Sequence, residues 1–165
     1  MRKNFRVPVL PYLKKYIEKQ FFAGLKAPYK IEEDSLIGKF MMSQIIDGRH
    51  KDLRGDKRIE MSQVIEIELS EAMAERSPSL GKLITVNYFL DKLFKNELIT
   101  WIKSADYCGV RPFPASKAFL QHYKIDENEY SHDAAYRHWL RDQQKGRRKT
   151  TAPAAQNNRS RGLAT

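Results

Sequence analysis

The sequence predicts an α+β protein, mainly helical, in which a small antiparallel sheet packs on a long central helix. Two patterns indicate this fold class. Residues 59–69 alternate between apolar and polar side chains, as a strand with one buried face does, and residues 84–107 carry apolar side chains at helical spacing. The composition, 41% hydrophobic and 30% charged, is typical of a globular protein. We therefore expect one globular domain at 1–145 and a disordered basic tail at 146–165.

The N-terminal part of the chain predicts two short strands and two helices. Residues 5–9 are β-prone but contain a proline, which suits an edge strand. Residues 11–21 have a proline in the first turn and an apolar stripe behind it, so they predict a helix. A second short strand is expected at 27–31, and Asp34 or Ser35 is expected to cap the next helix.

The middle of the chain predicts a loop, the clearest strand and the longest helix. Residues 47–58 are charged and contain two glycines, which indicates an exposed loop ahead of the strand at 59–69. After a break around Pro78, the apolar stripe of residues 84–107 predicts a helix about 30 Å long. Gly109 is expected to end this helix, which forms the spine of the domain and supports the sheet.

The C-terminal part predicts a short helix, one helical turn and a final amphipathic helix. Pro114 opens a helix over 115–123, and residues 126–129 have the side chains of a capping box. Ser131 caps the last helix. On a helical wheel one side of that helix is apolar and the opposite side basic. The apolar side holds Tyr136, Trp139 and Leu140, and the opposite side holds Ala134, Arg137, His138, Arg141 and Lys145.

This division between an anchoring face and a basic face is what a DNA-recognition helix requires. The stretch AAYRHWLR, residues 134–141, resembles the second helix of a helix-turn-helix unit, and FLQHYKI, residues 119–125, lies where the preceding helix and turn would be. The resemblance covers residues 114–145, with a connection longer than the usual three or four residues. It implies that the basic face contacts DNA. Because Trp139 lies opposite the basic side of the wheel, beside Tyr136 and Leu140, we expect it to belong to the fold.

The charge distribution favours a polyanionic partner. The net charge is +10 and the isoelectric point about 9.7. Residues 141–165 hold seven Lys or Arg and one Asp, so +6 of the total lies at this end. We expect DNA rather than RNA as the partner, with a regulatory role. The predicted contacts are Arg137, His138 and Arg141 from the contacting face, and Lys145, Arg147, Arg148 and Lys149 to the backbone.

Other classes of function find little support in the sequence. His50, His122, His132 and His138 lack the spacing of metal ligands, so no metal site and no cofactor are expected. Residues 77–82 end in Gly-Lys but lack the first glycine of a phosphate-binding loop. With a single cysteine, no membrane-spanning run and no signal peptide, we expect a cytoplasmic protein that is not an enzyme. The alternative is a structural or virion-type assembly protein whose basic arm binds nucleic acid or a partner without sequence specificity.

Overall fold

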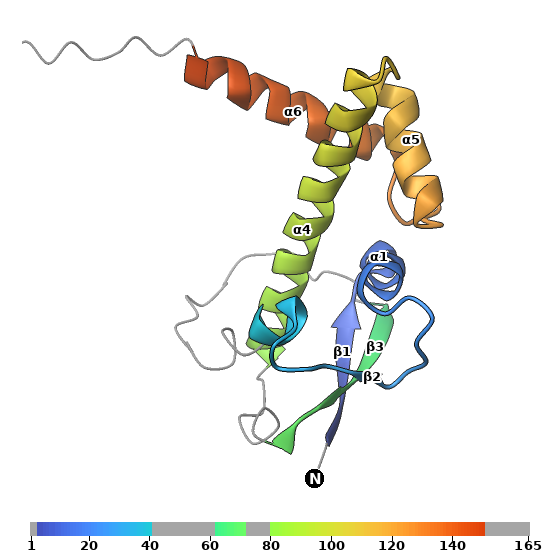
Figure 1. The fold of residues 1–165 in the computed structure, drawn as a ribbon, viewed down its shortest axis with the longest axis vertical. Helices are drawn as coiled ribbons and strands as arrows, with labels where there is room; N and C mark the ends of the chain where they lie inside the picture. Colours follow the sequence, from blue (N-terminus) through green and yellow to red (C-terminus); the bar gives the residue numbers. More distant parts are fainter. Residues whose placement is uncertain (1–2, 41–61, 72–79, 151–165) are drawn as a thin grey trace, which may run out of the picture.

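The computed structural model describes residues 3–40, 62–71 and 80–150. Figure 1 shows the elements arranged along one long helix, α4 (Leu80–Tyr107), with the sheet and α1 (Pro11–Phe21) near its start. Helices α5 (Pro112–His122) and α6 (His132–Thr150) lie at its other end and contact both α4 and each other. The predicted α+β class with a central helical spine is confirmed.

Among the described residues, the sheet contains three strands in the order β1-β3-β2. β1 (Lys3–Val9) pairs antiparallel with β3 (Gln63–Leu69), with Phe5 opposite Ile67. The two-residue strand β2 (Tyr29–Lys30) runs parallel to β3, so the prediction of a wholly antiparallel sheet was wrong. More than thirty residues separate β2 from β3, which is long enough for the crossover that parallel pairing requires. β1 is an edge strand as predicted, which accommodates Pro8.

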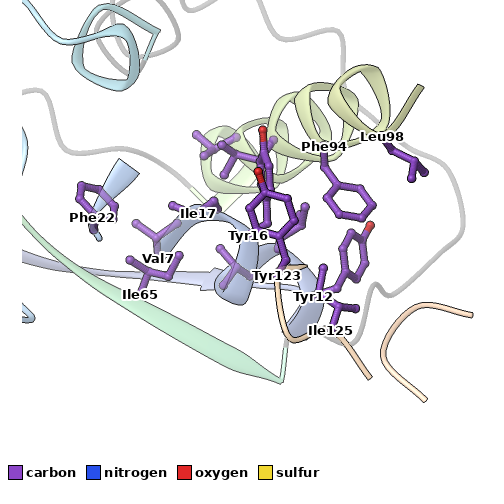
Figure 2. Packing of buried hydrophobic residues seen from close by; sticks show 14 of the residues in the cluster. Val7, Tyr12, Tyr16, Ile17, Phe22, Ile65, Phe94, Leu98, Tyr123 and Ile125 are labelled. Atoms are coloured by element: carbon purple, nitrogen blue, oxygen red, sulfur yellow. The ribbon is translucent and has the colours of Figure 1, made fainter. Parts of the chain in front are cut away.

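The core joins the sheet to α1 and α4. The alternation of β3 places Ile65, Ile67 and Leu69 on its buried face. Figure 2 shows Tyr16 of α1 and Phe94 of α4 within the same cluster, and their rings meet edge to face at 5.4 Å. Phe94 also contacts the rings of Tyr12, Phe119 and Tyr130, so it links both ends of the molecule. Its side chain is fully buried.

Several boundaries differ from the sequence prediction. α4 begins at Leu80 and has 28 residues, and α5 begins at Pro112 because that proline, not Pro114, occupies the first helical position. α6 continues to Thr150, so residues 146–150 are helical and the expected disordered tail does not begin at 146. One glycine within a helix costs only about 1 kcal/mol relative to alanine, and the Arg-Arg-Lys sequence after Gly146 favours helix.

Other predictions were confirmed or lie outside the described residues. Gly109 follows α4 with φ +83°, a conformation that favours glycine. Residues 36–40 are helical, in line with the helix expected after Ser35. The loop expected at 47–58 and the tail beyond Thr150 fall outside the described ranges.

Candidate nucleic-acid interface

The start of α6 is fixed by its own side chains and by α1. The Ser131 hydroxyl accepts a hydrogen bond from the Ala134 N–H at 3.1 Å, which confirms the predicted cap. In the turn before it, the Glu129 carboxylate accepts from the Asp126 N–H at 3.0 Å, as in a capping box. The Lys15 ammonium of α1 is 2.7 Å from carboxylate oxygens of both Asp126 and Glu129. These contacts hold the turn, and therefore α6, in a defined position.

The inner face of α6 packs on α4 and α5. Ala135 is fully buried, and Trp139 is partly buried against the core, as the sequence predicted. The Tyr136 ring stacks on Trp139 at 5.5 Å and meets the Phe113 ring of α5 edge to face at 5.5 Å. This half of the helix therefore belongs to the fold.

The outer face of α6 carries exposed cations. Arg137, Arg141 and Lys145 are all exposed and follow one another at intervals of four residues. The two acids of the helix are engaged: Asp142 pairs with Lys103 of α4 at 2.7 Å, and Asp133 lies 3.9 Å from Arg137. Among the described residues, the side chains of Arg141 and Lys145 form no hydrogen bond or salt bridge. Their charge is therefore available to a partner.

His138 differs from these cations in exposure, although the sequence grouped it with them. It is half-buried, and its ring lies 6.3 Å from that of Tyr130 at an interplanar angle of 22°. Burial, followed by the charge of Lys95, lowers the pKa of His138. The imidazole is therefore neutral at pH 7 and adds no charge to the outer face.

Leu140 was predicted to anchor the helix to the core, but it is 37% exposed. A helical wheel gives only the angle of each side chain around the helix axis. The position of α5 decides which of these side chains are covered. Gln144, one turn further along, is also exposed and was not predicted as a site residue. The sequence could have indicated this position, because Gln144 lies four residues after Leu140 and therefore on the same side of the helix.

The predicted backbone contacts Arg147, Arg148 and Lys149 lie within the last turns of α6, and their side chains are outside the described part of the structure. Nine residues, 123–131, connect α5 to α6. This connection is longer than a standard helix-turn-helix turn, as the sequence indicated.

Metal ions and membranes are two other kinds of partner that a protein can have. No group of three or more His, Cys, Asp or Glu among the described residues is placed to hold a metal ion. No helix in the described part is both long and apolar enough to cross a membrane. Comparison with protein-family models, curated proteins and solved structures finds no match for the chain.

Proposed function

We propose that this protein binds DNA through the outer face of α6, acting in the cytoplasm as a regulatory binding protein rather than an enzyme. The observation that carries the proposal is the row of exposed cations, Arg137, Arg141 and Lys145. Of the two acids of the helix, Asp142 pairs with Lys103 of α4, and Asp133 lies near this row, 3.9 Å from Arg137. Arg and Lys side chains in such a row suit phosphate oxygens and guanine edges. The further Arg and Lys residues of the last turns add positive charge to the same helix.

The packing of α6 supports this role in a second way. A helix that contacts nucleic acid must be held rigidly by its other face, so that binding does not have to order it. The buried Ala135, the packed Trp139 and the Ser131 cap supply that support. We propose that α5 and α6 act together as a helix-turn-helix-like unit with an enlarged turn.

A matched pair of double variants tests the proposal. Arg137→Ala with Arg141→Ala removes two cations from the outer face, and Lys26→Ala with Lys39→Ala removes two exposed cations elsewhere. Binding to a fluorescent DNA duplex is measured by anisotropy at several salt concentrations. Each arginine contact is worth about tenfold in affinity, and each lost phosphate contact reduces the log–log salt slope by about 0.9.

We expect the first variant to bind at least about tenfold more weakly, with a shallower salt dependence, and the second to bind like the parent. Equal binding by both variants would place the DNA elsewhere on the molecule. Thermal unfolding of both proteins checks that the substitutions, all at exposed positions, leave the fold intact.

A second candidate function is an assembly protein, and one surface favours it. Helices α4 and α5 form an open concave surface on which Trp101 and Val110 are partly exposed. Its lining is mostly small or apolar and includes Ala105, Ala115 and Ala118. Such a surface suits a protein partner. Sedimentation of the purified chain with and without DNA tests this candidate, which requires self-association independent of DNA.

A further inference from the structure

The C-terminal end of α6 extends away from the rest of the domain. Asp142 is tied to Lys103 of α4, but Gln144, Lys145 and Gly146 beyond it are exposed. Because the helix continues to Thr150, its last eight residues span about 12 Å. Figure 1 shows this end projecting past α4. A projecting helix can enter a groove without a clash between the domain and the groove walls.

The dimensions of such a helix distinguish between nucleic acids. An α-helix with its side chains is about 10–12 Å across, and the major groove of B-form DNA is about 12 Å wide. The major groove of an A-form RNA duplex is too narrow and deep for side chains to reach its bases. A projecting basic helix therefore suits duplex DNA better than duplex RNA.

Two uncharged side chains, those of Leu140 and Gln144, lie on the exposed side of α6 beside Arg137 and Arg141. Arg137, Arg141 and Gln144 follow the spacing i, i+4, i+7, which places them on one face, and all three are exposed. Leu140 is one turn before Gln144 and is 37% exposed, so part of its side chain can contact a partner. A glutamine amide can bond adenine with two hydrogen bonds, and an apolar side chain can contact the thymine methyl group. The pair thus suits A·T base pairs.

We infer that the projecting end of α6 enters the major groove of B-form DNA, where Gln144 binds an adenine edge, and that Leu140, one turn before Gln144, contacts a thymine methyl group at the edge of the same groove. This inference rests on the proposed function and adds a specificity-determining residue to it. The arginines supply most of the affinity, whereas Gln144 and Leu140 select the sequence.

Selection from a randomised DNA duplex library by the full-length chain tests the inference. The parent is compared with Gln144→Ala and with Gln121→Ala, a matched change at an exposed glutamine of α5. We expect the parent to enrich a motif that contains adenine, and Gln144→Ala to lower the preference for one adenine by on the order of tenfold. Leu140→Ala should lower the preference for thymine at the same or a neighbouring pair. Gln121→Ala should enrich the parent motif.

The outcomes separate this inference from the proposed function. If the parent binds DNA and the double arginine variant weakens binding, but Gln144→Ala enriches an unchanged motif, the proposed function stands and Gln144 is not a reader. A flat distribution for the parent, or equal affinity for a double-stranded RNA of the same sequence, overturns groove entry. If the parent binds no nucleic acid, both proposals fail.

Discussion

The junction between α1 and α4 and the outer face of α6 use charge in opposite ways. At the junction, Asp91 accepts a hydrogen bond from the Tyr12 hydroxyl at 2.7 Å, and Glu97 accepts from Tyr16 and Tyr123 at 2.6 Å each. On α6, by contrast, the exposed cations face solvent while the acids of the helix have partners. The carboxylates of Asp91 and Glu97 therefore stabilise the fold, whereas Arg141 and Lys145 of α6 remain available to a partner.

The electrostatics of the junction fit this division. Burial, together with the hydrogen bond to Glu97, raises the pKa of Tyr16, and burial raises that of Tyr12 beside Asp91. Both hydroxyls therefore stay protonated at neutral pH and donate to Asp91 and Glu97. Since Asp91 and Glu97 are held at the junction, they do not neutralise the outer face of α6.

The largest expected effect comes from breaking the junction at Phe94. Its fully buried ring contacts four other aromatic rings, so Phe94→Ala should lower the free energy of unfolding by about 3–5 kcal/mol. Chemical denaturation measures this loss. Tyr107→Ala is the control: Tyr107 is 94% exposed, and its removal should change stability by less than about 0.5 kcal/mol. A similar loss in both variants would mean that the ring cluster is not the centre of the fold.

Trp139 tests whether the inner face of α6 belongs to the fold. Because its side chain is only partly buried, Trp139→Ala should cost about 3 kcal/mol, the lower end of the range for a large aromatic. Denaturation and DNA affinity are measured on the same protein. If stability is unchanged while affinity collapses, Trp139 stacks on a base and the division between the two faces of α6 is wrong.

Glu97 tests the role given to the junction carboxylates. Glu97→Ala leaves two partly buried tyrosine hydroxyls without this acceptor, which should cost about 2 kcal/mol of unfolding free energy. Asn96→Ala, at an exposed neighbouring position on α4, should have little effect. DNA binding by the folded Glu97 variant should match the parent. A loss of affinity without a loss of stability would contradict the separation of the two regions.

The smallest expected effect concerns pH and His138. Because the pKa of His138 is lowered in the folded state, the unfolded chain binds more protons as the pH falls below about 6.5. This contribution to stability is present at pH 7.5 and decreases toward pH 5. The groups that influence His138 include Lys95, Asp91 and Arg141. His138→Asn should reduce the pH dependence of unfolding measured across that window. An unchanged pH profile would show that His138 is not responsible.

The sequence predicted the features that depend on residues adjacent in the chain. It missed the features that depend on segments which are distant in the chain and meet only in the fold. The alternation of residues 63–69 and the caps at Asp126 and Ser131 depend on adjacent residues, and these predictions hold. The parallel pairing of β2 depends on where a long connection returns, which no local pattern specifies. His138 was predicted to be exposed and is half-buried, whereas Leu140 was predicted to be buried and is exposed. The positions of Tyr130 and α5 decide which side of α6 is covered, and the sequence of α6 does not specify them.

We propose that α6, and not the chain beyond it, distinguishes DNA sequences. The most direct measurement is the ratio of affinities for a selected duplex and a scrambled one, by anisotropy, for three proteins. These are the parent, a chain that ends at Thr150 and so keeps the whole of α6, and the variant with Arg137→Ala and Arg141→Ala. We predict that the shortened chain keeps the ratio of the parent and that the double variant brings it close to one. Loss of all binding in the shortened chain, with parent-like binding by the double variant on both duplexes, would contradict the account and assign binding to a nonspecific arm.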